Sequence, residues 1–266
     1  MDRQTDEIVA YYTDRYREDL RLGARPQARL ERIRTAELLD ALLPAGARVL
    51  DVGGGPGAYA RALAGAGHRV RLLDLTPTHV ELARAGDPPL DAAVADARAL
   101  PEPDAAYDAT LLLGPLYHLT SAADRIAALR EAVRVTRPGG RVVAAAISRF
   151  AGPIDFAATA RLSDRLLAEA GKLRVDGVND GANGFTHAYF HRVEELVDEC
   201  RAAGLTDLEV HGVEGPAWPA AEAAVDTPQA DAVFAGALGL ARVVSGEPSL
   251  VMASAHLLAT GRVTVR

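Results

Sequence analysis

The pattern of apolar positions divides the chain into a helical beginning and a central alternation of strands and helices. Apolar residues at four-residue spacing, Ile8 and Tyr12 among them, predict a helix over 4–22, and a second apolar face predicts one over 27–43. The predicted strands of the alternation are 47–52, 69–74, 92–95, 107–113 and 141–147, and the predicted helices are 57–66, 77–85 and 121–135. Short apolar strands separated by helices are typical of a parallel sheet covered on both faces.

After residue 147 the pattern becomes less regular. The predicted elements are a helix near 154–172, a Gly/Asn/Asp-rich loop, a helix over 191–203, a strand over 206–213, helices within 215–246 and a last strand over 249–262. No stretch is rich enough in Pro, Gly or Ser to separate two domains. We therefore expect a single domain, 1–266, with the insertions 148–186 and 215–246 forming a cap at one edge of the sheet.

Composition narrows the class of protein. The chain has 266 residues, 49% of them hydrophobic, which is enough for a full-sized core. Its single cysteine, Cys200, excludes an internal disulfide framework and fits a reducing compartment. The sequence shows neither a signal-peptide pattern nor an apolar run of membrane-spanning length, so we expect a cytoplasmic protein with no membrane partner. A net charge of −7 argues against a nucleic-acid partner, because such domains are usually basic.

The segment "VLDVGGGPGAYARALA" (49–64) carries the first chemical signal. An apolar strand runs through four glycines into a helix, and at such turns backbone N–H groups face ligands. The glycines fit G-x-G-x-x-A, which is close to a dinucleotide fingerprint, and equally D-x-G-x-G-x-G from Asp51, Gly53, Gly55 and Gly57. The glycine pattern alone leaves both interpretations open.

Three aspartates lie at or next to the ends of the first three predicted strands. Asp51 precedes the turn, where a carboxylate would repel a pyrophosphate and attract an ammonium group. Asp74 ends the second strand, in position to accept hydrogen bonds from ribose hydroxyls. Asp96 follows the third strand, in position to accept from an adenine amino group. Asp51 as a local cap of the turn, and Asp96 as an ordinary loop acid, remain the alternatives.

Five motifs in order carry a resemblance to a known family: "VLDVGGGPG", "LLDLT", "VADARALP", "YDATLLLGPLYHL" and "LREAVRVTRPGGRVV". Over residues 35–147 the chain resembles the class I, Rossmann-like S-adenosylmethionine-dependent methyltransferases of the small-molecule type. The resemblance implies an α/β fold, a three-layer doubly wound sheet of seven strands with an antiparallel last strand. It also implies a helical lid at 1–43 and a cofactor-binding core at 44–147.

The resemblance also implies which residues hold the cofactor, S-adenosyl-L-methionine. Its expected contacts are Gly53, Gly55 and Gly57 along the turn, Asp74 at the ribose, Leu75, Asp96 and Ala97 at the adenine, and Leu113 or Gly114 at the methionine part. From the lid, a ring face of Tyr16 would attract the sulfonium, and Arg29 would pair with the cofactor's carboxylate. The alternatives are that the lid tyrosines only pack and that Arg29 lies on the surface.

The end of the fourth strand indicates where chemistry would occur. Gly114-Pro115 forces a turn that would leave Tyr117 and His118 facing the cofactor, and both are candidate catalytic residues. His118 is the candidate general base, because imidazole accepts a proton near neutral pH; a capping role is the alternative. The chain lacks the Asn/Asp-Pro-Pro-aromatic motif of the family's nucleobase and amide methyltransferases. That departure favours a small-molecule substrate.

Aromatic residues elsewhere are candidates for the substrate wall. They are Tyr11 and Tyr12 in the lid, His187 and Tyr189 in the first insertion, and Trp218 in the second, with packing roles as the alternatives. His118, His187 and His191 share no helix face and have no cysteine or paired carboxylate beside them, so we expect no metal.

The expected function is methyl transfer to an O, N or C atom of a small metabolite, in bacterial specialised metabolism, by a monomer or homodimer. The alternatives are a non-methylating enzyme on the same fold, an NAD-dependent oxidoreductase and a non-catalytic cofactor-binding subunit.

Overall fold

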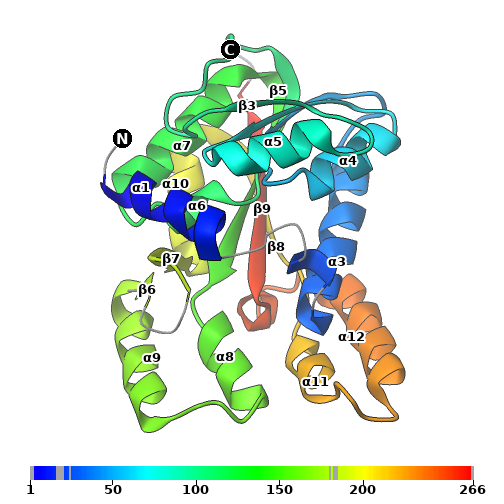
Figure 1. Cartoon of the computed structure of the whole chain (residues 1–266), viewed down its shortest axis with the longest axis vertical. Coiled ribbons are helices and arrows are strands. Elements are labelled where there is room, and N and C mark those ends of the chain that lie inside the picture. Colours follow the sequence, from blue (N-terminus) through cyan, green and yellow to red (C-terminus); the bar gives the residue numbers. More distant parts are fainter. Residues whose placement is uncertain (1–2, 16–20, 24, 180, 182–184, 265–266) are drawn as a thin grey trace.

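The computed structural model describes residues 3–15, 21–23, 25–179, 181 and 185–264. Within them, five parallel strands form the centre of a mixed sheet in the order β3-β2-β1-β4-β5 (Figure 1). Their bounds are β1 Arg48–Val52, β2 Arg69–Asp74, β3 Asp91–Val94, β4 Tyr107–Leu112 and β5 Thr136–Ser148. The predicted alternation is therefore present, and β2 has the predicted bounds.

The last strand runs against the others, as the resemblance implies. β9 (His256–Val263) is antiparallel both to β5 and to β8 (Leu205–Gly212), which completes seven strands. Two further short strands were not predicted: β6 (Val178–Asn179) pairs with β7 (Ala188–His191), and β7 pairs with the end of β5. Both lie beside the Gly/Asn-rich loop, where a run of two to four residues gives no periodicity.

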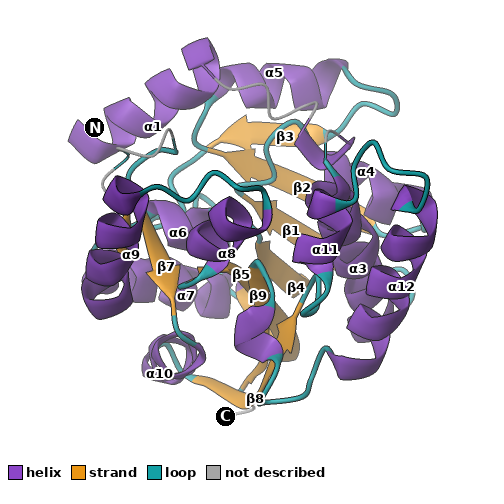
Figure 2. Cartoon of the chain, turned by 90° about the horizontal axis from the view of Figure 1, so that it is seen from below, coloured by secondary structure: helices purple, strands orange, loops and turns teal. Residues whose placement is uncertain are grey.

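Helices cover both faces of the sheet (Figure 2). One face is covered by α3 (Pro26–Leu42), α4 (Ala58–Gly65) and α5 (Pro77–Ala85), and the other by α7 (Ala122–Val135) and α10 (Val193–Ala202). The strands are apolar on both sides: Leu50 and Leu112 pack toward α7 and α10, whereas Val49 and Leu111 pack toward α3 and α4. This two-sided burial produces the apolar runs in the sequence.

Both insertions are helical and extend below the sheet in Figure 1. The first contains α8 (Ala151–Ala158) and α9 (Asp164–Asp176), and the second contains α11 (Trp218–Ala223) and α12 (Ala230–Val244). The single helix predicted over 154–172 is wrong: the chain breaks after α8, where Ala160 has a positive φ of 55°. A 3₁₀ turn, Val251–Ala253, precedes β9, so the last strand starts later than predicted.

The N-terminal segment is helical where the structure describes it, and the part of the predicted helix over 16–20 lies outside the described residues. α1 spans Arg3–Ala10 and continues as a π-helix over Tyr11–Arg15. Ile8 is buried, and it reaches the cavity described below together with Tyr12. Among the described residues, no helix is both long and apolar enough to cross a lipid bilayer.

Candidate active site

A cavity of about 270 Å³ lies at the carboxyl ends of β1 to β4, the position at which open parallel sheets bind ligands. The N-terminal helix and a short helix, α6 (Pro115–His118), form its other walls. Twelve of the residues predicted for the site line it: Tyr12, Asp51, Gly53, Gly55, Asp74, Leu75, Asp96, Ala97, Leu113, Gly114, Tyr117 and His118.

The turn after β1 requires glycine for steric reasons. Gly53 and Gly55 have positive φ angles of 71° and 57°. A Cβ on Gly53 would lie 2.6 Å from the ring of Pro115, which opens α6. The missing side chain therefore lets two walls of the cavity approach each other. Gly57 does not line the cavity: its φ is 92°, and a Cβ there would meet Leu90, so its predicted cofactor contact is replaced by a packing role.

Asp51 is the least satisfied group in the cavity. It is 1% exposed, and neither of its carboxylate oxygens has a hydrogen-bond partner among the described residues. Burial, together with the neighbouring charge of Asp74, raises the pKa of Asp51 to about 7. It does not cap the turn. A buried carboxylate in this condition favours a cationic neighbour.

Asp74 organises the loops on either side of β2. Its carboxylate accepts hydrogen bonds from the backbone N–H groups of Gly55 and Thr76, both at 2.8 Å, and lies 3.2 Å from Nδ1 of His79. The carboxylate thus fixes the glycine turn to the start of α5. Its lining position next to that turn is the position predicted for a ribose contact.

Asp96 carries an ion pair that the sequence did not indicate. Its carboxylate accepts from the guanidinium of Arg98, with the shortest contact at 2.7 Å. Leu75 and Ala97 line the cavity beside it. These three residues form the end of the cavity at β2 and β3, where the adenine was expected.

The opposite wall is aromatic and neutral. Nε2 of His118 lies 2.8 Å from the hydroxyl of Tyr12, and the ring of Tyr117 lies 4.7 Å from the imidazole. Burial lowers the pKa of His118 to about 4, so the imidazole is uncharged at neutral pH. A neutral imidazole in the wall can accept a proton, but its low pKa makes it a weak base.

Besides Gly57, five other predicted residues lie outside the lining of the cavity. Arg29 is exposed, with its guanidinium 4.4 Å from the ring of Phe234 on α12, which corrects its predicted pairing with the cofactor. Trp218 is 2% exposed in an apolar cluster, and its indole N–H donates to the Ala253 carbonyl at 3.0 Å. It therefore anchors the second insertion, as its packing alternative proposed.

The remaining three are Tyr11, His187 and Tyr189. The ring of Tyr11 packs at 5.2 Å from that of Tyr12, behind the wall. His187 is exposed, and the ring of Tyr189 lies against the guanidinium of Arg125. Tyr16 falls outside the residues that the structure describes.

Sequence reasoning missed several lining residues with polar side chains, among them Arg21, Tyr59, Arg61 and His79. Arg21 is the arginine of the lid segment that reaches the cavity, and its Nη1 lies 2.5 Å from Glu31. The sequence holds no signal that separates Arg21 from Arg29. For His79 the sequence did contain a signal, because this residue lies in the first turn of the helix that follows Asp74.

A charged cluster lies behind Arg21. Nδ1 of His256 lies 2.5 Å from Glu214 and 3.8 Å from Glu31, and Glu214 also accepts from Ser254 at 2.7 Å. Although burial opposes protonation, the two carboxylates raise the pKa of His256 to about 9. Among the described residues, Glu31, Glu214 and His256 are close enough to share one metal ion. The proton on His256 already balances Glu214, so we interpret the cluster as a buried ion-pair network.

Comparisons with known proteins agree with this geometry. Residues 49–140 match a family model described as a methyltransferase domain. The chain is 31% identical over 151 residues to a demethylmenaquinone methyltransferase of Renibacterium salmoninarum, a match that covers 56% of this chain and 62% of the relative. It is 37% identical over 119 residues to the 27-O-demethylrifamycin SV methyltransferase of Amycolatopsis mediterranei, covering 41% and 42%. The matches thus span about half the length of these relatives.

Solved structures share the fold over most of the chain. A SAM-dependent methyltransferase of Thermotoga maritima, a possible histamine N-methyltransferase, superposes with a TM-score of 0.56 at 18% identity and covers 89% of this chain and 90% of its own. The [4+2]-cyclase SpnF superposes with a TM-score of 0.54 at 22% identity, covering 88% and 82%. The chain therefore shares the Rossmann-like α/β fold of these S-adenosylmethionine-dependent methyltransferases, and the match to the methyltransferase-domain family lies within residues 49–140.

Proposed function

We propose that the chain binds S-adenosyl-L-methionine in this cavity and transfers its methyl group to a small-molecule acceptor. The observation that carries the proposal is Asp51, a buried carboxylate at the cavity with no hydrogen-bond partner among the described residues. Burial and the neighbouring charge of Asp74 raise the pKa of Asp51 to about 7, so a positive charge beside the carboxylate would stabilise its ionised form. The ammonium group of the cofactor would supply that charge, whereas a pyrophosphate would add a second negative one.

The remaining groups fit the other parts of the same cofactor. Asp74 would accept from the ribose hydroxyls, and Asp96 would lie at the adenine, between Leu75 and Ala97. Arg21, in place of Arg29, would pair with the carboxylate. Gly53 and Gly55 have no side chains, so their backbone itself lines the cavity.

When bound, the cofactor supplies a methyl group on a positively charged sulfur, which is already an activated electrophile. The protein's task is therefore to align the acceptor and to exclude water, which contributes roughly 7–11 kcal/mol in well-oriented reactions. Tyr12, Tyr117 and His118 form the wall suited to that task. His118 is uncharged at neutral pH, so its imidazole can accept a hydrogen bond or a proton from the acceptor, although a pKa of about 4 makes it a weak base.

We further propose that the acceptor is a small molecule of bacterial specialised metabolism. This proposal is supported by the net charge of −7, which disfavours a nucleic-acid substrate, and by the relative that acts on a rifamycin.

Titration calorimetry with S-adenosylhomocysteine, the demethylated product, tests cofactor binding, with NADH as the competing ligand. We expect saturable heat for S-adenosylhomocysteine and none for NADH; saturation by NADH alone would overturn the proposal in favour of an oxidoreductase. Methyl transfer is tested by incubating the protein with methyl-labelled S-adenosylmethionine and a panel of hydroquinones, phenols and amines, and searching for labelled product by mass spectrometry.

A further inference from the structure

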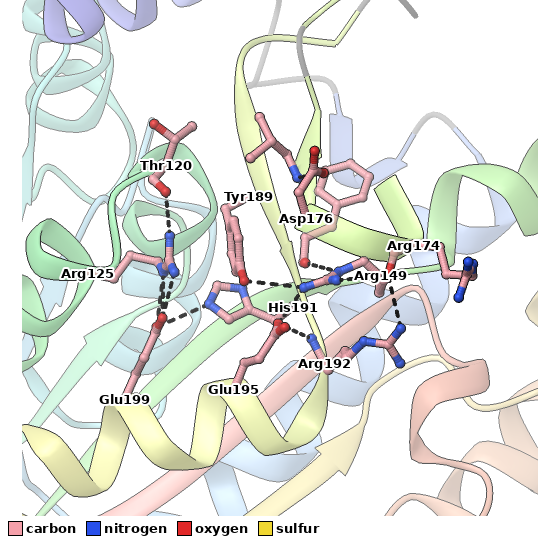
Figure 3. Close-up of polar contacts among 12 residues, drawn as sticks. Thr120, Arg125, Arg149, Arg174, Asp176, Tyr189, His191, Arg192, Glu195 and Glu199 are labelled. Atoms are coloured by element: carbon pink, nitrogen blue, oxygen red, sulfur yellow. Dashed lines mark hydrogen bonds and ion pairs between the residues drawn. The ribbon is translucent and has the colours of Figure 1, made fainter. Parts of the chain in front are cut away.

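A second buried polar network lies outside the cavity, between α7, α10 and β7 (Figure 3). Its centre is Arg125, which is 2% exposed and lies in the first turns of α7. Nε and Nη2 of Arg125 donate to the carboxylate of Glu199 on α10, at distances of 2.6 to 3.0 Å. The ring of Tyr189 lies over the guanidinium, 3.7 Å from its central carbon.

The third nitrogen of the same guanidinium reaches the wall of the cavity. Nη1 of Arg125 donates to the backbone carbonyls of Leu119 at 2.8 Å and Thr120 at 2.9 Å. These carbonyls directly follow His118, and both Leu119 and His118 line the cavity. One planar group thus connects the far side of α7 to the backbone behind the proposed acceptor wall.

We propose that Arg125 is a positioning residue that fixes the backbone after His118 and so sets the place of the imidazole in the cavity wall. The proposal deepens the proposed function and rests on it for its catalytic meaning. Arginine suits the task because its five N–H donors lie in one plane and can serve a carboxylate and two carbonyls together. A lysine would keep the positive charge, but its ammonium group could not bind the carboxylate and the two carbonyls together.

Residues from the second half of the chain hold Arg125 in place. Glu199 also lies 3.3 Å from Nε2 of His191, at the end of β7. Tyr189, stacked on Arg125, accepts at 3.3 Å from Nη2 of Arg149, and Arg149 donates to the carbonyl of Phe190 at 2.6 Å. The position of α6 therefore depends on β7 and α10, which follow the first cap insertion.

Arg149 provides a matched control. It is fully buried, pairs with Glu195 on the same helix α10 at 2.5 Å and donates to backbone carbonyls, as Arg125 does. None of the hydrogen bonds described for it reaches α6 or the segment after it. Arg125→Lys and Arg149→Lys therefore impose a similar loss on two buried arginines. Only the first removes direct hydrogen bonds to the backbone after His118, because the described contact between Arg149 and Arg125 runs through Tyr189.

The experiment follows the cavity wall without needing an acceptor or cofactor. The ring ¹⁵N resonances of His118 are recorded in protein labelled at histidine and assigned by their loss in His118→Gln. Amide hydrogen exchange of residues 116–121 is measured in parallel. In Arg125→Lys we expect displaced His118 resonances and exchange about 10-fold faster over 116–121, whereas Arg149→Lys, which acts through Tyr189, should change both much less.

Unchanged His118 resonances in a folded Arg125→Lys protein, or equal changes in both variants, would overturn the positioning role. Should Arg125→Lys fail to fold, Glu199→Gln replaces it, because it weakens the same pair and leaves the guanidinium in place. Calorimetry of the wild type with S-adenosylhomocysteine decides the proposed function separately. If the wild type did not bind S-adenosylhomocysteine, the proposed function would fail, but the comparison of Arg125→Lys with Arg149→Lys would still test the positioning role.

Discussion

The two halves of the cavity differ in how their polar groups are satisfied. On the side of the strand ends, Asp51 is buried with both carboxylate oxygens unpartnered among the described residues. On the side of α6, His118 and Tyr12 lie 2.8 Å apart, and the pKa of His118, lowered to about 4, leaves the imidazole neutral. One half thus holds an uncompensated charge, whereas the other is neutral and bonded within the protein.

This difference assigns a separate task to each half within the proposed function. A buried carboxylate gains most from a cationic ligand, so the strand-end half would supply affinity and charge selectivity. The aromatic half offers little charge, so it would select an acceptor by shape. The predictions below alter one half at a time, with affinity for S-adenosylhomocysteine or stability as the readout.

The largest effect is expected from Gly53→Ala. A Cβ at a φ of 71° is strained and would lie 2.6 Å from Pro115, so the glycine turn and α6 must separate. We expect affinity to fall about 100-fold and the free energy of unfolding to fall by about 2–3 kcal/mol. Gly46→Ala is the control: its φ is 68°, but nothing lies within 4 Å, so it should cost about 1 kcal/mol and leave affinity within about twofold. Equal losses of affinity in both variants would contradict the steric argument.

Asp51→Asn should weaken binding and stabilise the free protein. Loss of the carboxylate lowers affinity about 30-fold, measured by calorimetry, because an ammonium group loses its buried partner. The pKa of Asp51 is about 7 in the folded protein and near the ordinary 3.8 when unfolded, so the folded state binds the extra proton. The contribution of Asp51 to the stability of the wild type therefore falls as pH rises from about 4 to 7.

Asp51→Asn has no titrating carboxyl group at this position, so this pH dependence should be absent in the variant. Chemical denaturation above pH 7 should find Asp51→Asn more stable than the wild type by about 2–4 kcal/mol, and the difference should vanish near pH 4. A variant that is less stable than the wild type at pH 8 would mean that the carboxylate has a partner in the free protein.

Arg21→Ala and Arg29→Ala separate the two arginines of the N-terminal region. Arg21 lines the cavity, whereas Arg29 lies against Phe234 on the surface. We expect Arg21→Ala to lower affinity about 10-fold through loss of a charge-assisted pair, and Arg29→Ala to leave it unchanged. The opposite ranking would restore Arg29 as the partner of the cofactor's carboxylate.

Trp218→Phe should have the smallest effect on binding. The indole is buried in an apolar cluster and donates to Ala253, so its loss should lower the free energy of unfolding by about 1–3 kcal/mol. Affinity for S-adenosylhomocysteine should stay within about twofold, because the indole does not line the cavity. A clear loss of affinity in a fully folded variant would return Trp218 to the ligand-binding residues.

The accuracy of the predictions from sequence also differs between the two halves of the cavity. The strand-end half is encoded by short local motifs: the glycine turn and Asp51 are contiguous, and β2 and α5 have their predicted bounds. Local periodicity and turn chemistry suffice there.

The other half depends on contacts between distant segments. Tyr12 meets His118 across 106 positions, and Arg125 meets Glu199 across 74. Their aromatic character and their place in the insertions made Tyr189 and Trp218 candidates for the substrate wall, but tertiary packing placed Tyr189 on Arg125 and Trp218 in the core of the cap. Helical spacing likewise gave no reason to prefer Arg21 over Arg29.

The most direct test of the central claim is the number of protons released when S-adenosylmethionine binds at pH 7, obtained by calorimetry in buffers of different ionisation enthalpy. A cationic ligand beside Asp51 lowers its pKa from about 7, so the wild type should release about half a proton and Asp51→Asn none. Absence of binding, or the same proton release from both proteins, would contradict the account.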